Sequence, residues 1–411
     1  MAEQSRGPVM VAIPDHTGAL RVVYLFGGDE RQTGLDGSSV DWLADIHDSD
    51  VRLEFNAGGA LAFAETLGPT GRPLEHSPRE ALRRVLRSAS EMGFQVRLGV
   101  EPEFFAIRRG RAGEIRPVDR LGYFSLPPRE VESVLLEIAR VAGELGLRVV
   151  KFHHEVAPGQ YEIVPAGGDP LEVCDSVVAL KALVRREFEA AGMGATFMPK
   201  PFSSVNGSGM HLHLSLLRDG RSAFLDGGGP SKVALSFLAG LLRRAREITA
   251  VAAPTVNSYK RLVPGHEAPV YLAWGRSNRS ALVRVPWYGG SFERIEFRVP
   301  DSSSSPHLVA ALAIAAGLEG IEERLDPPEE VRVNVYEADG LETLPADPGE
   351  ATRELRSSEF ARTVLTDRVV DAIAGRLEAD YREYLREVGD WGSTRLAVSE
   401  WELSRYLDVG S

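Results

Sequence analysis

The feature that most constrains the fold is a strand-like segment with ionisable side chains at alternate positions. In GVEPEFFAI, residues 99–107, alternate residues face opposite sides of an extended chain. Val100 and Phe104 face one side, which is typical of a core, while Glu101 and Glu103 face the other. Two neighbouring carboxylates repel each other, and burying an unpaired carboxylate costs several kcal/mol. Such a strand needs an apolar core behind it and cations in front of it.

The same alternation recurs in four further segments. In each, an apolar face backs a polar or ionisable one, as in GMHLHLSLLRDG, whose Asp-Gly pair predicts a hairpin turn. Any one of these strands could be the solvated face of an antiparallel sheet. Lys is absent from all five polar faces, however, and His, Glu and Arg dominate them. The polar positions are Glu101 and Glu103; Glu155, Gln160 and Glu162; His211, His213 and Ser215; Arg284; and Arg294, Glu296 and Arg298.

Five such faces favour one sheet that binds cations through carboxylates and imidazole and binds anions through arginine. Carboxylates with one or two histidines suit hard divalent ions, Mg²⁺ or Mn²⁺. Bound cations also remove the repulsion between the paired carboxylates. Two metal ions with several arginines are the apparatus of phosphoryl transfer.

Composition excludes several other classes of protein. Among 411 residues, 43% are hydrophobic and 26% charged, as in an ordinary globular protein. The net charge of -12 argues against a nucleic-acid binder. Cys174 is the only cysteine, so we expect no intrachain disulfide and a reducing, cytoplasmic setting. The first 20 residues contain no long apolar block, so no secretory signal is expected. The segment 308–318 is too short to span a bilayer, so we expect a buried helix and no membrane partner.

The spacing of apolar residues and turn signals along the chain predicts two domains and an α+β fold. Residues 8–65 alternate short strand-like runs with turn signals, which indicates a small sheet-rich domain. After the turn-rich stretch 68–76, apolar stripes at helical spacing predict helices near 77–93 and 127–146. Strands and helices alternate from there on. We place the boundary between residues 72 and 73.

A Pro- and Gly-rich stretch at 257–286 concentrates further charge. Its first half is predicted to be a loop carrying Lys260, Arg261, His266 and Glu267. An exposed charged loop is one interpretation. The other is a loop that covers a site and carries catalytic groups.

Six motifs in order make the chain resemble the glutamine synthetase family over nearly its whole length. They are VEPEFF, HHEVAPGQYE, NGSGMHLHLSL, NSYKRLVPGHEAPV, NRSALVRVP and RIEFRVPD. The resemblance implies a β-grasp N-terminal domain (1–72) and a catalytic domain (73–411) built on a curved antiparallel sheet flanked by helices. It also implies a homo-oligomer of hexameric rings, commonly stacked as a dodecamer, with active sites between neighbouring subunits.

The resemblance also assigns roles to individual residues, with two to three Mg²⁺ or Mn²⁺ ions per active site and ATP as cosubstrate. One metal ion would be bound by Glu103, Glu155 and Glu162, and a second by Glu101, His211 and Glu296. ATP would contact Ser215, Arg279, Arg284 and Arg294. Glutamate would be held by Asn206, Gly207, Arg261 and Arg298, with His213 near the transferred phosphate. Arg279 and Arg298 are also implied to act in catalysis.

The implied reaction is ATP-dependent ligation of an amine to the γ-carboxylate of L-glutamate through γ-glutamyl phosphate. Asp36, Tyr123 and the loop residue Glu267 would bind ammonium and take its proton, with Ser39 and Asp50 nearby. Retention of Asp36 with Glu267 favours glutamine synthesis. The alternative is a γ-glutamyl ligase for a polyamine or another primary amine.

Two further classes of function stay open at this stage. A catalytically inactive nucleotide-binding regulator would be expected to lose metal ligands or the loop glutamate, and the sequence keeps them. A two-metal phosphohydrolase would not need Asn206, Arg261 and Arg298. The sequence departs from the family pattern at Ser204 and Val205, in KPFSSVNGSG, and at Ser291, where a lysine is common.

Overall fold

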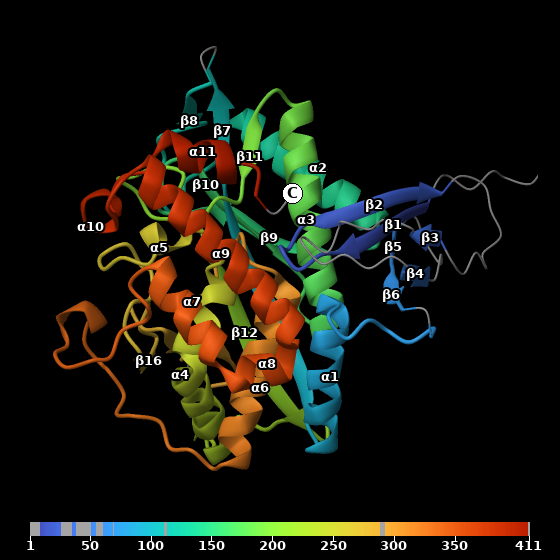
Figure 1. Ribbon diagram of the computed structural model, residues 1–411, viewed down its shortest axis with the longest axis vertical. Coiled ribbons are helices and arrows are strands. Elements are labelled where there is room, and N and C mark those ends of the chain that lie inside the picture. Colours follow the sequence, from blue (N-terminus) through green and yellow to red (C-terminus); the bar gives the residue numbers. More distant parts are fainter. Residues whose placement is uncertain are drawn as a thin grey trace, which may run out of the picture.

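The computed structural model describes residues 9–25, 35–37, 51–54, 61–68, 70–110, 113–287 and 292–409, with the backbone alone for 9, 23–25, 35–37 and 51–54. One large sheet runs through the molecule with long helices packed against it (Figure 1). The combination confirms the predicted α+β class. Among the described residues, every helix is too short or too polar to cross a membrane.

The large sheet joins strands that lie far apart in the sequence. Its main order is β16-β17-β18-β12-β7-β10-β9, and the neighbours are antiparallel except for β16 with β17. Three short strands, β8, β11 and β13, pair at its margins. The bounds are β7 (Gln95–Arg109), β8 (Ile115–Pro117), β9 (Val149–His154), β10 (Gln160–Pro165), β11 (Gly194–Thr196), β12 (Met210–Arg218), β13 (Arg221–Ser222), β16 (Trp274–Arg276), β17 (Val283–Val285) and β18 (Ile295–Phe297).

The predicted polar strands are therefore neighbours in one sheet. All five predicted segments contribute to it, as β7, β10, β12, β17 and β18. The predicted hairpin is also present, because Asp219 (φ 51°) and Gly220 (φ 73°) connect β12 to β13 with the positive φ angles that a two-residue hairpin turn requires. A second small hairpin pairs β14 (Leu225–Asp226) with β15 (Gly229–Pro230).

The apolar sides of β7, β12 and β18 share one core with α1 (Pro78–Glu91), α4 (Lys232–Ala252) and α6 (Pro306–Glu322). Helix α6 contains the segment 308–318, which is buried as predicted. Helices α4 and α6 are in close contact, since a Cβ at Gly240 would lie 2.0 Å from the Ala316 carbonyl oxygen. A larger side chain at Gly240 would push the two helices apart.

A second core lies under β10 and the other half of β7. Phe104 packs there against Phe188 and Phe197, with ring centroids 5.5 and 5.6 Å apart. The covering helices are α2 (Arg129–Glu144) and α3 (Pro170–Ala190), so the helices predicted near 77–93 and 127–146 are both present.

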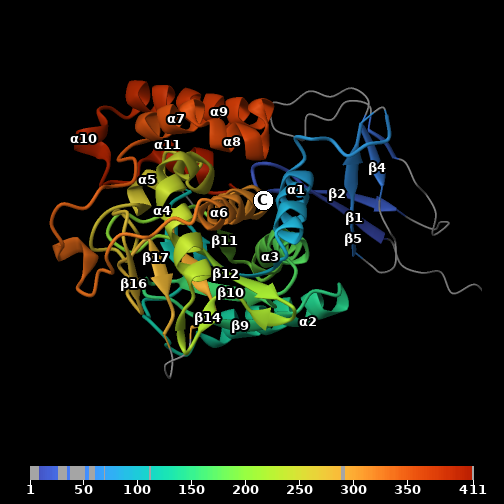
Figure 2. The ribbon, with the colours of Figure 1, turned by 90° about the horizontal axis from the view of Figure 1, so that it is seen from below.

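The N-terminal strands lie to one side of this body (Figures 1 and 2). They form two three-stranded sheets, β2-β1-β5 and β3-β4-β6. A buried ionic network ties them to the helices, because Arg79 of α1 pairs with Glu65 of β6 and with Asp175 of α3. The predicted boundary after residue 72 stays a prediction. The bounds are β1 (Val9–Pro14), β2 (Leu20–Leu25), β3 (Leu35–Gly37), β4 (Val51–Glu54), β5 (Leu61–Phe63) and β6 (Glu65–Leu67).

The C-terminal helices form an outer layer beyond α4 and α6 (Figure 2). The last of them anchors the short helix that carries the SYKR motif. Glu402 accepts hydrogen bonds from Lys260 Nζ at 2.5 Å and from Asn257 Nδ2 at 2.8 Å, and both charged side chains are fully buried. The bounds are α5 (Ser258–Arg261), η1 (Val335–Glu337), α7 (Pro348–Ser357), α8 (Glu359–Leu365), α9 (Asp367–Glu387), α10 (Trp391–Thr394) and α11 (Glu400–Tyr406).

Removing one partner of this buried ion pair should destabilise the protein strongly. Glu402→Ala leaves the Lys260 ammonium in the interior without its carboxylate, which we expect to lower the free energy of unfolding by about 3–5 kcal/mol. Urea denaturation followed by circular dichroism measures the change. Glu400→Ala, at an exposed position of the same helix, is the control. Equal midpoints for the two variants would contradict the prediction.

Candidate functional site

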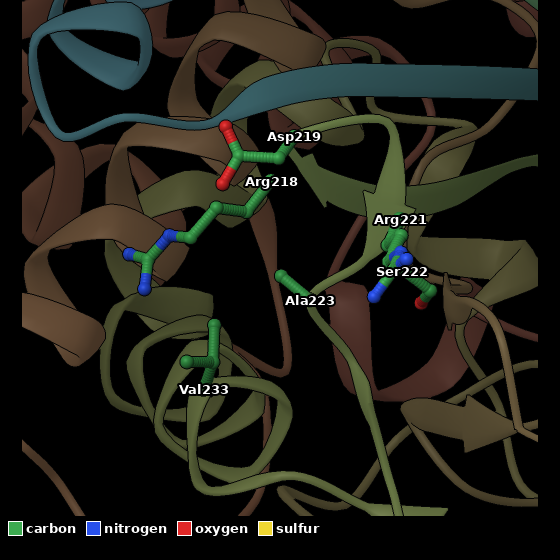
Figure 3. A pocket seen from close by; sticks show the side chains of 6 residues that line it. All are labelled: Arg218, Asp219, Arg221, Ser222, Ala223 and Val233. Atoms are coloured by element: carbon green, nitrogen blue, oxygen red, sulfur yellow. The ribbon is translucent and has the colours of Figure 1, made fainter.

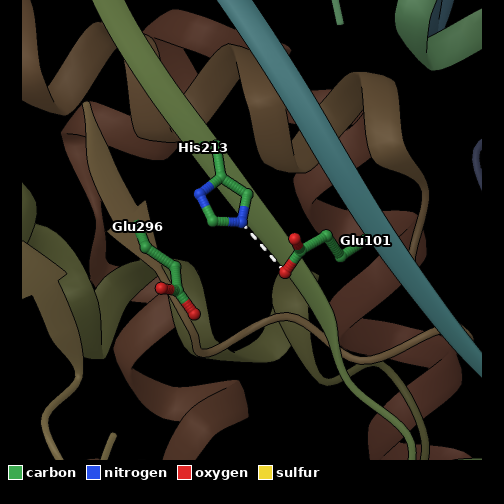
Figure 4. A group of neighbouring side chains, drawn as sticks. All are labelled: Glu101, His213 and Glu296. Carbon is green, nitrogen blue, oxygen red and sulfur yellow. Dashed lines mark ion pairs between the residues drawn. The ribbon is translucent and has the colours of Figure 1, made fainter. Parts of the chain in front are cut away.

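The strand register brings an acidic group together across three neighbouring strands. His213 of β12 lies directly opposite Glu296 of β18, and Glu101 comes from β7 on the other side. One ligand atom from each of the three lies within 4.8 Å of the others, and His213 Nε2 is 3.0 Å from Glu101 Oε2 (Figure 4). These side chains could hold a metal ion.

The prediction placed His211 in this group, whereas the structure brings His213 into it. His211 is opposite Glu101 in the ladder, and its Nδ1 lies 3.7 Å from Glu296 Oε1 and 4.0 Å from Glu103 Oε1. Both histidines project from the same face of β12, so strand alternation alone cannot choose between them. Burial, with Arg298 nearby, holds the pKa of His211 well below its usual range and leaves a neutral imidazole, the form that binds metal. The role of His211 as a ligand stays a prediction.

The negative charge of Glu296 is compensated by two arginine side chains. Glu296 is buried between Arg284 and Arg298, and both guanidinium groups donate hydrogen bonds to it. Burial alone would raise the pKa of Glu296, but Arg298 and the two histidines outweigh it and bring the pKa to about 2. This side chain is therefore ionised at neutral pH.

A second acidic group lies at the edge of the sheet. His153 of β9 is opposite Glu162 of β10, and Glu155 follows in the next loop. His153 Nε2 is 2.8 Å from Glu155 Oε1, and His153 Nδ1 is 3.5 Å from Glu162 Oε1. Sequence reasoning named Glu155 and Glu162 but missed His153. The available signal was the alternation of Lys151 and His153 in VVKFHH, a segment that was not predicted to be a strand.

Glu103 stands opposite Glu162 in the ladder of β7 and β10, and two hydrogen bonds hold its carboxylate. Its Oε2 accepts hydrogen bonds from Gln160 Nε2 at 2.9 Å and from the Gly209 amide at 2.8 Å. Burial and the neighbouring Glu155 raise the pKa of Glu103 well above its usual range. A cation placed here would reverse that effect, because it favours the ionised carboxylate.

Lys151 is an unexpected member of the polar face. Its Nζ is 2.9 Å from Glu162 Oε1 and 3.6 Å from Glu101 Oε1, so it reaches one carboxylate of each group. Burial and Glu101 nonetheless raise the pKa of Glu162 to about 7. The expectation that the polar faces lack Lys holds for the five predicted strands, but the structure adds a sixth strand, β9.

A small pocket opens beside Glu103 and Glu155. Asn206 and Arg261 line it together with Arg298 and the loop residue Glu267. Asn206 Nδ2 lies 3.5 Å from Glu267 Oε2, and the Arg298 guanidinium donates to the Glu267 carbonyl at 3.1 Å. The predicted loop is present at Glu267, which has a positive φ of 54°. It is wrong for Lys260 and Arg261, because both lie buried in the short helix α5.

Gly207, the other predicted substrate contact, also lines this pocket, and there the chain has no room for a side chain. A Cβ at Gly207 would lie 2.4 Å from the Pro199 carbonyl oxygen. Glycine therefore lets the NGSG loop pass close to the segment before it.

The remaining predicted residues lie around this centre. Arg294 Nε donates to His213 Nδ1 at 3.2 Å, and Arg279 donates to the Tyr123 hydroxyl at 3.2 Å. Ser215 is on the same face of β12 as His213. The side chain of Asp36, and residues Ser39, Asp50 and Ser291, lie outside the described residues.

A different pocket, of about 410 Å³, lies at the β12–β13 hairpin (Figure 3). Arg218, Asp219, Arg221 and Val233 are among the residues that line it. None of the predicted site residues does so. The predicted substrate contacts Asn206, Arg261 and Arg298 line the smaller pocket beside the carboxylates instead.

The comparisons with known proteins agree with this geometry. A family model described as "Glutamine synthetase, catalytic domain" matches residues 75–406. The chain is 38% identical over 406 residues to the glutamine synthetase of Clostridium saccharobutylicum, covering 92% of this chain and 89% of the relative. It is 39% identical over 402 residues to that of Halobacterium salinarum, covering 91% and 86%.

Solved structures have the same fold. A GmaS/ADP complex superposes with a TM-score of 0.81 at 28% identity, covering 98% of this chain and 96% of that one. The glutamine synthetase of Plasmodium falciparum has the same TM-score and coverage at 21% identity, which shows the fold alone. The fold and the matches define a ligase that forms carbon–nitrogen bonds. The chain belongs to the glutamine synthetase family and is an enzyme of the glutamate–ammonia ligase kind.

Glu296 offers the sharpest test of the group formed by Glu101, His213 and Glu296, which we call the inner acidic group, because it is close to both His211 and His213. Glu296→Gln should weaken Mn²⁺ binding by more than about tenfold, since even partners that only orient a metal ligand contribute 10–100-fold. Isothermal titration calorimetry measures the affinity. Glu293→Gln, an exposed neighbour, is the control. An unchanged Mn²⁺ affinity in Glu296→Gln would rule out this group as a metal site.

Proposed function

We propose that this protein joins ammonium to the γ-carboxylate of L-glutamate in an ATP-dependent reaction in the cytoplasm. One observation carries the proposal. Two carboxylate–imidazole groups lie on one sheet, and Glu155 of the second group also lines a pocket with Asn206, Arg261 and Glu267. Metal-bound phosphate and an amino-acid substrate would then lie side by side. The named relatives at 38–39% identity support the same reaction.

The donor set fits hard divalent ions. Each group offers two carboxylates and an imidazole, and oxygen-rich sets of this kind suit Mg²⁺ and Mn²⁺. Bound ions would neutralise phosphate charge during transfer. The ligand sets that the resemblance implies share two carboxylates with each of these groups: Glu155 and Glu162 with Glu103 for one ion, and Glu101 and Glu296 with His211 for the other, with two to three ions per active site.

The basic side chains around the centre would bind the substrates. Arg284 lies on β17 and Arg294 directly precedes β18, and we assign both to ATP together with Ser215 and Arg279. Arg261 and Arg298 line the small pocket and would receive glutamate with Asn206 and Gly207. His213, which lies between Glu101 and Arg294, would be close to the transferred phosphate.

The reaction has two steps. The glutamate γ-carboxylate attacks the γ-phosphorus of ATP, ADP leaves, and γ-glutamyl phosphate forms. Ammonia then attacks the γ-carbonyl carbon, and phosphate leaves with the bonding pair. The proton that ammonium loses would pass to a carboxylate near the pocket, and Glu267, Asp36 and Tyr123 are the proposed acceptor-site residues.

A second candidate acceptor is a primary amine that carries an alkyl group. One observation favours it. The loop that holds Tyr123 also exposes Phe124 and Leu126, with 66% and 78% of their surface accessible, which could face an apolar substituent.

A side-by-side acceptor assay separates the two candidates. We expect kcat/KM for ammonium to exceed that for methylamine, ethanolamine, putrescine or spermidine by about tenfold or more, because one methyl group in a fitted pocket changes discrimination by about that factor. ADP release, measured with glutamate and each amine, provides the rates. ADP release without glutamate or amine would indicate a phosphohydrolase. A better rate with a primary amine would replace glutamine synthesis by the second candidate.

Asp36 tests the acceptor site and the assembly together. We propose hexameric rings stacked as a dodecamer, with Asp36 reaching the site of the neighbouring subunit. Asp36→Ala should reduce kcat/KM for ammonium by about 100-fold, the lower end for a general base, while ATP binding stays unchanged. Asp219→Ala, in the distant hairpin turn, is the control. Light scattering gives the assembly, and an active monomer would disprove the shared site.

A further inference from the structure

Lys151 lies where the two acidic groups meet. It projects from β9, the last strand in the main order of the sheet, onto the same face as His153. Its ammonium nitrogen is 2.9 Å from Glu162 and 3.6 Å from Glu101. Glu101 belongs to the inner acidic group and Glu162 to the outer one, which consists of His153, Glu155 and Glu162. A single cation of the chain itself therefore joins the two groups.

Two carboxylates from neighbouring strands meet at this position. Glu101 and Glu162 face each other closely enough for one cation to reach both carboxylates. Mg²⁺ binds carboxylate oxygens at about 2.0–2.1 Å, and a lysine ammonium cannot share that space with it. The ammonium carries one charge where a metal ion would carry two. It therefore reduces the repulsion between the groups without drawing in a further ion.

We propose that Lys151 is a built-in cation that takes the place of a third divalent ion between the two acidic groups. The inference rests on the metal-dependent ligase proposed above and refines it, since it fixes the number of divalent ions at two per active site. Lys151 also keeps Glu101 and Glu162 near each other before any metal ion binds.

Metal stoichiometry is the direct test. Equilibrium dialysis of the full chain against Mn²⁺, without substrates, should give two bound ions per chain for the natural protein and three for Lys151→Met. Lys151→Arg keeps the charge and should retain two. Lys232→Met, which removes an exposed lysine at the start of α4, is the matched control and should also retain two. Three ions in the natural protein, or the same number in Lys151→Met as in the natural protein, would overturn the proposal.

Thermal melting provides a second readout that does not depend on counting ions. In EDTA, Lys151→Met should melt below the natural protein, because Glu101 and Glu162 lose their shared cation. Its rise in melting temperature on adding Mn²⁺ should then be the larger of the two. Because 47% of the Lys151 side chain is accessible, the substitution should leave the core intact. Identical melting of both proteins in EDTA and in Mn²⁺ would contradict the proposed role.

The two readouts are separable from the proposed reaction. Both are measured without ATP, glutamate or amine. A protein that binds two Mn²⁺ ions, gains a third in Lys151→Met and forms no glutamine would retain this inference and lose the proposed reaction. A protein that forms glutamine but binds the same number of ions in both forms would do the reverse.

Discussion

The structure depends on balancing negative charge on one face of a sheet. Five glutamates meet there, and most of them are largely withdrawn from water, where an uncompensated carboxylate is strongly unfavourable. The chain supplies part of the compensation itself. Arg284 and Arg298 hold Glu296, amide donors hold Glu103, and Lys151 reaches Glu162 and Glu101. The rest of the charge remains for the metal ions proposed above, and with them the same face would be both a folding constraint and a binding site.

The layers behind the sheet serve this arrangement. A strand holds a charged face at a fixed position only if its opposite face is closely packed. The core shared with α4 and α6 provides that packing. Farther out, the buried pair of Glu402 and Lys260 fixes the helix that ends in Arg261. The pocket residues are therefore positioned by contacts that reach to the C-terminal helices.

Local sequence predicted the polar faces well because strand alternation is a local property. It placed Glu101, Glu103, Glu162 and Glu296 on polar faces, and the structure joins those strands in one sheet. It could not say which residues stand opposite one another, since pairing joins segments far apart in the chain. That is why His213 appears beside Glu296, and why Lys151 and His153 were missed on an edge strand whose pattern is mixed. The family motifs supplied the substrate roles, which no periodicity encodes.

The register of these strands also bears on how such a protein can change over evolutionary time. Each acidic group is assembled from different strands, with His213 opposite Glu296 and His153 opposite Glu162. A single inserted or deleted residue within any of them would turn its ligands to the apolar side and its core residues to the site. Length variation should therefore be confined to the connections, such as the loop that carries Glu267, while the strands change only by substitution. New acceptor preferences can arise from those connections without disturbing the proposed cation-binding face.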